Sequence, residues 1–209
     1  MPRVIFFTAS TLNGFLADAD DNLDWLFAVE QARDTFPSFL EGIGAIVQGS
    51  TTYEWVLAHE DLLAHPEKWP AFYGARPTWV FTTRELPGVA GADVRFAAGA
   101  VREAWPAIAA AAGDRDVWLV GGGDLVGQFD DAGLLDEIRV QFAPVTLSAG
   151  RPLLPRTIDS TRLRLEGVAR NGQFAEVTYR VRHPEAEAEP KAGPEPEPEP
   201  TPAPDAHGA

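Results

Sequence analysis

Four segments of strand length are almost entirely apolar, and they constrain the fold of this chain more than any other feature. They are residues 4–9, 45–49, 78–83 and 117–121. Strands that are covered by helices on both faces are continuously apolar rather than alternating, as in parallel sheets. The sequence places helix-length segments between and after them, at residues 29–41, 51–58, 100–112 and 124–132. This order predicts an α/β domain with a mostly parallel sheet.

The last third of the chain predicts strands that close the sheet. Residues 135–145, 162–168 and 174–182 are strand-like, and Asn171-Gly172 is a strong signal for a hairpin turn between the last two. We therefore expect a mixed sheet with a C-terminal antiparallel hairpin. Among the expected helices, Pro37 and Pro106 should shorten or kink those that contain them.

Length and composition limit the class of protein. With 209 residues and 45% hydrophobic content, the chain is expected to form one globular domain with a sizeable core. A run of about 18 apolar residues is missing, as is a secretory leader, so we expect no membrane partner and a cytoplasmic location. Cysteine is absent and the four histidines have no metal-ligand spacing, so we expect no metal site.

The net charge of −14 is unevenly distributed. Residues 183–209 hold seven acids, one lysine and eight prolines, a composition typical of disordered segments. We predict a domain at 1–182 and a disordered acidic Pro/Glu-rich tail at 183–209, which either solvates the protein or binds a partner. The domain itself carries 24 acids against 16 bases, which argues against a nucleic-acid partner.

Short polar stretches follow each of the four apolar strands. They are residues 9–13, 49–52, 82–84 and 121–124, all rich in Gly, Ser, Thr or Asn. Because ligands of open α/β sheets bind outside the carboxyl ends of the strands, we expect these stretches to form one ligand-binding rim.

Three consecutive glycines, Gly121 to Gly123, separate the fourth apolar strand from a helix. We expect Asp124 to cap a helix that begins at Leu125, whose free N–H groups attract phosphate. Glycines at this place would let a diphosphate approach the backbone, and a tightly packed turn is the alternative. Neither the G-x-G-x-x-G pattern nor a Walker loop is present.

Hydroxyl side chains occupy two other parts of the predicted rim. Ser50, Thr51 and Thr52 open a helix, where they could donate to a phosphate or simply cap the helix. Thr82 and Thr83 precede Arg84, and this combination suits the phosphate of an adenosine ribose, with a solvated turn as the alternative.

The ordered set "SxxNG", "DW", "GSTTYE", "VFTTR", "VGGGDLVGQF", "LLDEIRVQFAPV" and "GRPLLP" resembles the dihydrofolate-reductase-like superfamily. The most similar branch is that of small stand-alone proteins akin to the reductase domain of the bifunctional riboflavin-biosynthesis deaminase-reductase. The resemblance covers residues 1–182. It implies a three-layer α/β/α sandwich, a homodimer, and NADPH as cofactor with NADH as the alternative.

The resemblance also assigns site residues. It implies a cis peptide between Gly121 and Gly122, and it matches Trp25 to a loop tryptophan at the substrate. Tyr53 is a candidate to stack on the substrate, and a place in the core is the alternative for both aromatic residues. Asn13 and Glu30 take the catalytic positions, and Glu30 is expected to be buried in the cleft with a raised pKa unless it is simply a solvated acid. The residues implied at the cofactor are Ala9, Ser10, Gly49, Ser50, Thr51, Thr52, Thr82, Thr83, Arg84, Val120, Gly121, Gly122, Gly123, Asp124 and Leu125.

The chain departs from the pattern of this branch at two positions. Asn13 stands where many relatives have an aspartate, and an amide cannot exchange a proton. Ser50 stands where relatives have an arginine, so a bidentate phosphate clamp is lost, and Arg84 is a candidate to replace it.

These features favour a nicotinamide-dependent reductase of a small pterin- or pyrimidine-like substrate, with no general acid assigned. The alternative is a catalytically degenerate nucleotide-binding or scaffold dimer of the same fold. A second alternative is an interaction protein that acts through its acidic tail.

Overall fold

The computed structural model describes residues 1–30 and 35–183. The predicted tail, apart from His183, and part of the helix expected at 29–41 lie outside these residues. The strands are β1 (Val4–Thr11), β2 (Phe15–Ala17), β3 (Ile43–Gly49), β4 (Thr78–Phe81), β5 (Val94–Ala97), β6 (Asp116–Gly121), β7 (Glu137–Ala143), β8 (Arg151–Pro152), β9 (Leu163–Asn171) and β10 (Phe174–Val181). The helices are α1 (Asp24–Phe27), α2 (Phe36–Glu41), α3 (Ser50–His59), the 3-10 helix η1 (Pro66–Lys68), α4 (Trp69–Tyr73), α5 (Val101–Ala112) and α6 (Gly123–Asp131).

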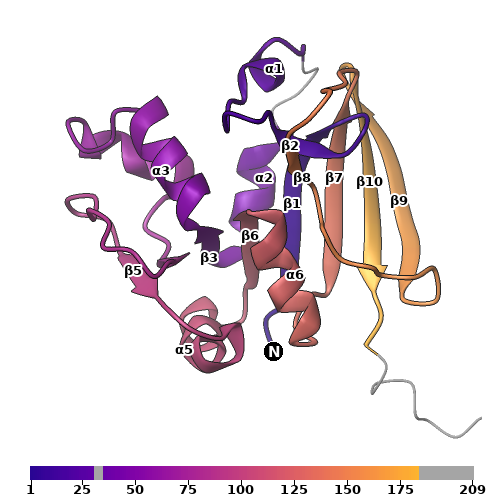
Figure 1. The fold of residues 1–209 in the computed structure, drawn as a ribbon. Coiled ribbons are helices and arrows are strands. Elements are labelled where there is room, and N and C mark those ends of the chain that lie inside the picture. The colour runs from indigo at the N-terminus through magenta and orange to yellow at the C-terminus, as the bar shows by residue number, and fades with distance from the viewer. Residues whose placement is uncertain (31–34, 184–209) are drawn as a thin grey trace, which may run out of the picture.

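Eight strands form one sheet in the order β5-β4-β3-β6-β1-β7-β10-β9. The six strands from β5 to β7 are parallel, and β10 runs antiparallel both to β7 and to its hairpin partner β9. Figure 1 shows this hairpin at one side of the molecule and β5 at the other. The short strands β2 and β8 pair with each other as a separate ribbon. The α/β architecture with a mixed sheet and a C-terminal hairpin is therefore confirmed.

Two apolar clusters, one on each face of the sheet, make up the core. One cluster joins the sheet to α5 and α6 through residues such as Ile108 and Phe129. The other joins it to α2, α3 and α4 through residues such as Tyr53 and Trp69. These helices form the outer layers of an α/β/α sandwich.

Of the two prolines expected to shorten or kink a helix, Pro37 lies in a helix that is shorter than expected, whereas Pro106 does not interrupt its helix. Pro37 lies in the first turn of α2, which begins only at Phe36, because proline suits the start of a helix and not its interior. By contrast, Pro106 lies within α5 on an exposed position, and the helix runs uninterrupted to Ala112.

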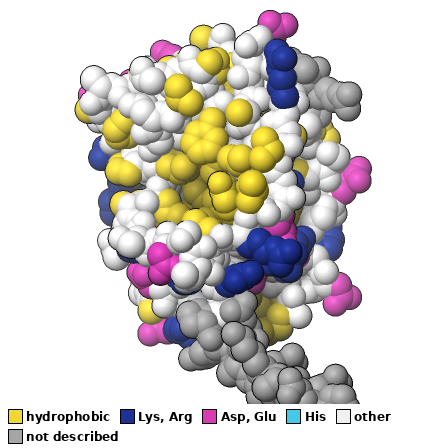
Figure 2. Space-filling model, turned by 90° about the vertical axis from the view of Figure 1, so that its right-hand side faces the viewer, with side chains coloured by type: hydrophobic (Ala, Val, Ile, Leu, Met, Phe, Trp, Pro, Cys, Tyr) yellow, Lys and Arg dark blue, Asp and Glu magenta, His cyan; other side chains and the backbone are white. Residues whose placement is uncertain are grey.

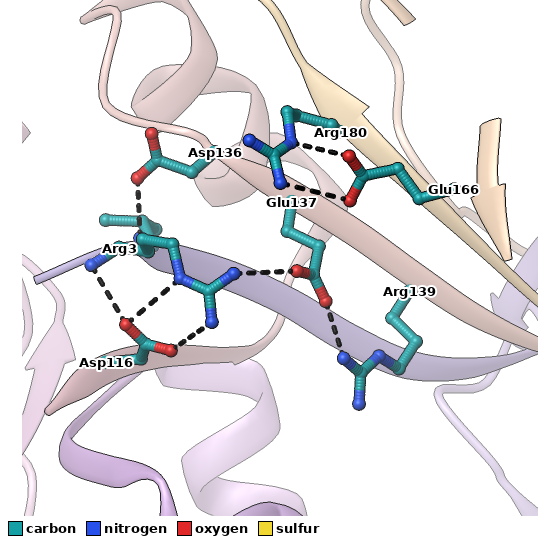
Figure 3. Close-up of polar contacts among 8 residues, drawn as sticks. Arg3, Asp116, Asp136, Glu137, Arg139, Glu166 and Arg180 are labelled. Atoms are coloured by element: carbon teal, nitrogen blue, oxygen red, sulfur yellow. Dashed lines mark hydrogen bonds and ion pairs between the residues drawn. The ribbon is translucent and has the colours of Figure 1, made fainter. Parts of the chain in front are cut away.

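A charged network ties the amino ends of three central strands together (Figure 3). Arg3 donates to Asp116 at 2.6 Å and to Glu137 at 3.3 Å, and Arg139 donates to Glu137 at 2.7 Å. The guanidinium of Arg139 also lies 5.6 Å from the ring centre of Phe7. Because it joins β1, β6 and β7 at the edge opposite the carboxyl ends, we interpret this network as structural.

Candidate functional site

A cavity of about 460 Å³ opens at the carboxyl ends of β1 and β6, the edge where ligands of α/β sheets bind. Segments from five parts of the chain meet there. Its lining is largely apolar and comprises Thr8, Ala9, Leu16, Ala17, Asp21, Leu23, Leu26, Thr51, Thr52, Trp55, Val56, Val120, Gly121, Gly122, Gly123, Asp124, Arg151, Pro152 and Pro155.

The glycine triplet forms one wall of this cavity. Gly121 ends β6, Gly122 has a φ of +89°, and Gly123 begins α6. A Cβ on Gly121 would lie 3.4 Å from Thr52 Oγ1, and one on Gly122 would lie 3.8 Å from Leu125 Cβ. Side chains at these two positions would therefore narrow the space between β6 and α3, and Gly122 also supplies a backbone conformation that other residues rarely adopt.

One face of α3 forms the opposite wall. Thr51, Thr52, Trp55 and Val56 all line the cavity because their spacing places them together on one side of the helix. The ring of Trp55 stacks on His59 with centroids 4.4 Å apart and on Phe27 of α1 at 6.1 Å. This stack holds α1 against α3 beside the cavity.

The segment between β2 and α1 supplies a third wall and one of the charged residues in the lining, Asp21. Asp21 accepts hydrogen bonds from Arg151 Nε at 2.5 Å and Nη2 at 2.8 Å, and this contact lowers the pKa of Asp21. Asp124 accepts a hydrogen bond from Arg156 Nη2 at 3.1 Å. Both carboxylates that line the cavity are thus paired with arginines.

Several residues predicted for the cofactor do meet in this cavity. They are Ala9, Thr51, Thr52, Val120, Gly121, Gly122, Gly123 and Asp124. Asp124, however, lies inside the first turn of α6 and is not its N-cap. The helix begins at Gly123 with Gly122 as N-cap. The peptide bond between Gly121 and Gly122 is trans, so the cis bond expected from the resemblance is not found.

A second group of predicted residues lies at the same edge of the sheet without lining the cavity. Gly49 and Ser50 join β3 to α3, and Thr82 and Thr83 follow β4. Arg84 forms a bidentate ion pair with Glu54 of α3. Its guanidinium is therefore already engaged, which weakens the expectation that Arg84 replaces the clamp lost at Ser50.

Two predicted cofactor residues are enclosed by the protein. Ser10 is fully buried, and its hydroxyl donates to the carbonyl oxygens of Thr11 and Phe15. Leu125 is buried in the core on the side of the sheet where α5 and α6 pack.

The residues predicted for catalysis and substrate binding do not line the cavity. Asn13 is exposed, and its amide bonds to Thr11 Oγ1 and to the backbone of Leu147. Glu30 is exposed rather than buried, and its carbonyl oxygen accepts from Gln173 N in the hairpin turn. The sequence distance from Trp25 that suggested Glu30 as the catalytic acid therefore selected a residue that does not line the cavity.

The two aromatic residues predicted for the substrate also lie elsewhere. Tyr53 is fully buried in the core, where its hydroxyl donates to Pro87 O at 2.7 Å and burial raises its pKa to about 12. Trp25 belongs to α1 and does not line the cavity, and its Nε1 is buried without a hydrogen-bond partner among the described residues.

Sequence reasoning gave no site role to several lining residues. Val56 could have been identified by extending the helical spacing from Thr52. Arg151 had no such signal, because its position depends on the pairing of β8 with β2.

In residues 1–30 and 35–183, no group of three or more His, Cys, Asp or Glu side chains could hold a metal ion. Within the same residues, no helix has the length and apolar character needed to cross a bilayer.

Residues 65–174, more than half of the chain, match the family described as the RibD C-terminal domain. Two uncharacterized proteins of Bacillus subtilis are similar in sequence. YwjB is 27% identical over 179 residues, which cover 85% of this chain and 97% of YwjB. YyaP is 29% identical over 157 residues, which cover 72% of this chain and 79% of YyaP.

Solved structures share the fold. A protein from Shewanella sp. PV-4 assigned to riboflavin biosynthesis has a TM-score of 0.68 at 23% identity, covering 86% of this chain and 99% of its own. The diaminohydroxyphosphoribosylaminopyrimidine deaminase/5-amino-6-(5-phosphoribosylamino)uracil reductase of Thermotoga maritima has a TM-score of 0.58 at 18% identity. The match covers 87% of this chain and 57% of that enzyme, so this chain spans little more than half of it.

Proposed function

The chain belongs to the RibD C-terminal domain family, and on that premise we propose that it is a nicotinamide-dependent reductase of a small heterocycle. The observation that carries the proposal is the cavity at the carboxyl ends of β1 and β6, which is walled by a glycine triplet and the start of α6. When bound, NADPH supplies a hydride to a ring carbon of the substrate, and a ring heteroatom takes up a proton.

The residues at this edge fit an extended nucleotide. Gly121 and Gly122 leave room beside the backbone, and the free N–H groups at the start of α6 favour a phosphate. The carboxyl ends of β6, β3 and β4 follow one another in the sheet. We place the nicotinamide end beside Ala9 and the adenosine end toward Ser50 and Thr82.

The substrate occupies the part of the cavity between Trp55 and the segment before α1. Its lining by Leu16, Leu23, Leu26 and Trp55 suits a flat ring, and the names of solved relatives favour a pyrimidine, with a pterin as the second choice. Asp21 is not the proton donor, because Arg151 lowers its pKa and keeps it ionised. Because the other lining carboxylate, Asp124, is also paired with an arginine, we propose that water supplies the proton.

The preference for NADPH over NADH is expected to be small. Ser50 provides no cation at the start of α3, and Arg84 is paired with Glu54. A 2′-phosphate would have to compete with this carboxylate for the guanidinium. A metabolic reductase of this kind would work in the cytoplasm.

A nucleotide-binding protein without catalysis is the second candidate. The position of Asn13 favours it, since the amide is engaged with Thr11 and Leu147 outside the cavity. In that case the cavity binds the nucleotide but the protein catalyses no reduction.

A second copy of this chain is the partner that we propose for the hairpin. Figure 2 shows hydrophobic side chains gathered on the face of the molecule where β10 and β9 lie. Val168 and Leu165 of β9 are 68% and 53% exposed and pair with Val177 and Tyr179 of β10. Because β9 also leaves one edge of the sheet open, association with another copy would cover both features.

Light scattering after gel filtration tests this association. We expect a dimer for the wild type and for Leu63→Glu, whose exposed side chain lies in the loop after α3, and a monomer for Val168→Glu. A monomeric wild type would exclude the dimer.

The reductase activity is tested by following NADPH oxidation with a panel of pyrimidines and dihydropterins. Oxidation that depends on one of these rings supports the reductase. Nucleotide binding without oxidation by any of them favours the non-catalytic candidate.

A further inference from the structure

Asp21 and Arg151 form an ion pair in the lining of the cavity. Arg151 begins β8, and its Nε and Nη2 donate to the two carboxylate oxygens of Asp21 at 2.5 and 2.8 Å. Both residues line the cavity. Charge-assisted bidentate pairs of this kind are the strongest side-chain hydrogen bonds, so the pair leaves this face of the guanidinium closed to other anions.

The backbone on both sides brings this pair together. Gly150 precedes Arg151, and a Cβ on Gly150 would fall on the carbonyl oxygen of Ala17, so only glycine lets β8 approach β2 at this point. On the other side, Asp18 Oδ1 accepts from the backbone N–H groups of Asp20 and Asn22. This small loop holds Asp21 at a φ of +61°, a conformation that costs energy for residues other than glycine.

The charged residues in the lining decide how the cavity receives an anionic substrate. Among the described residues that line the cavity, Arg151 is the only cationic one, and Asp21 and Asp124 carry the opposite charge. Arg156 lies nearby but is engaged by Asp124 and Asp131, both at 3.1 Å. A phosphate entering at the substrate end would meet the carboxylate of Asp21 and a guanidinium that is already neutralised.

We propose that Asp21 determines the charge selectivity of the cavity: by occupying Arg151, it excludes a phosphate from the substrate end and admits an unphosphorylated ring. The inference rests on the proposed function in taking this cavity as the substrate site. In this proposal Asp21 is a specificity-determining residue, because its ion pair prevents Arg151 from binding an anionic substrate.

Thermal unfolding in inorganic phosphate, compared with sodium chloride at equal ionic strength, tests this proposal. Asp21→Asn removes one charge while keeping a residue that tolerates positive φ. Asp20→Asn is the matched control, because it removes the same charge from an exposed neighbour that does not line the cavity. The double variant Asp21→Asn/Arg151→Gln removes the cation as well.

We expect phosphate to raise the unfolding temperature of Asp21→Asn at a concentration about tenfold lower than for the wild type, since a charged hydrogen bond is gained. Asp20→Asn and the double variant should behave as the wild type does. Equal phosphate dependence of the wild type and Asp21→Asn would overturn the proposal, and so would an equal gain in Asp20→Asn.

A titration with uridine and uridine 5′-monophosphate extends the test to a ring. We expect the wild type to bind uridine 5′-monophosphate no more tightly than uridine. Asp21→Asn should bind the monophosphate more tightly than uridine. Tighter binding of the monophosphate to the wild type would overturn the inference.

NADPH titration of the same samples separates the inference from the proposed function. One possible result is that the wild type binds no NADPH while phosphate still stabilises Asp21→Asn at a lower concentration than it does the wild type. In that case the reductase proposal fails and the role of Asp21 in charge selectivity stands. If NADPH binds and the phosphate contrast is absent, only the inference fails.

Discussion

A Cβ on Gly123 would lie 2.5 Å from the carbonyl oxygen of Leu153, so the first residue of α6 packs directly against the segment that follows β8. The carbonyl oxygen of Pro152 is equally close. Of the three glycines, Gly123 is therefore required by packing within the protein, whereas Gly121 and Gly122 face the cavity. The triplet is at once a packed turn and a wall of the cavity.

Gly123→Ala should destabilise the protein, because backbone carbonyls cannot move aside as side chains do. We expect a loss of about 2 kcal/mol, in the range of overpacked substitutions. Urea unfolding followed by circular dichroism measures it. A loss below about 0.5 kcal/mol would show that the contact relaxes without cost.

Gly121→Ala should weaken NADPH binding and leave stability nearly unchanged. Its Cβ would lie at ordinary contact distance from Thr52 Oγ1 but would project into the space proposed for the nucleotide. The control is Gly42→Ala, whose Cβ would lie 3.6 Å from Phe39 O, away from the cavity. Isothermal calorimetry with NADPH measures the affinity, and unchanged affinity in Gly121→Ala would place the nucleotide elsewhere.

Glu137→Gln should destabilise the fold by about 3 kcal/mol, because it leaves two guanidinium groups without their shared carboxylate. The side chain of Glu137 is only 8% exposed and accepts from Arg3 and Arg139 (Figure 3). Glu166→Gln is the control, since its pair with Arg180 lies at the surface and should contribute less than about 1 kcal/mol. Denaturant unfolding of both variants checks the contrast, and equal losses would contradict it.

Tyr53→Phe should lower stability by about 1 kcal/mol, through loss of the hydrogen bond to Pro87 O, and leave NADPH affinity unchanged. Burial raises the pKa of Tyr53 to about 12 from an ordinary value of about 10. The wild type therefore loses stability as the pH rises from about 10 to 12, because only the unfolded chain releases this proton.

Unfolding measured across that pH range, with Tyr53→Phe as the reference, shows this dependence as a difference between the two proteins. A parallel course of the two curves would mean that the hydroxyl ionises freely in the folded state. A large loss of NADPH affinity in Tyr53→Phe would show that Tyr53 takes part in nucleotide binding after all.

The buried strands and their carboxyl-end rim could be predicted because they depend on local patterns. Continuous apolar runs identified β1, β3, β4 and β6, and parallel order alone brings their carboxyl ends to one edge. The cavity then forms where the glycines and the first turn of α3 had been expected. The short strands β2, β5 and β8 had no such pattern, since they are brief and partly exposed.

Residues whose roles were assigned by their sequence distance from a motif were predicted less well. Glu30 was placed by its distance from Trp25, but the chain around it turns toward the hairpin and leaves the side chain in solvent. Tyr53 adjoins Thr52 in sequence yet lies on the other side of α3, because one step along a helix rotates the side chain by about 100°. The Asp21–Arg151 contact joins residues far apart in sequence and needed the tertiary structure.

Binding of reduced nicotinamide nucleotides is the central claim, and a fluorescence titration of the purified protein with NADPH and NADH tests it most directly. Trp55 lines the cavity, so a bound nicotinamide should quench its emission. We predict saturable binding of both nucleotides with dissociation constants within about tenfold of each other, because Arg84 is paired with Glu54. The absence of saturable binding by either nucleotide would contradict the account.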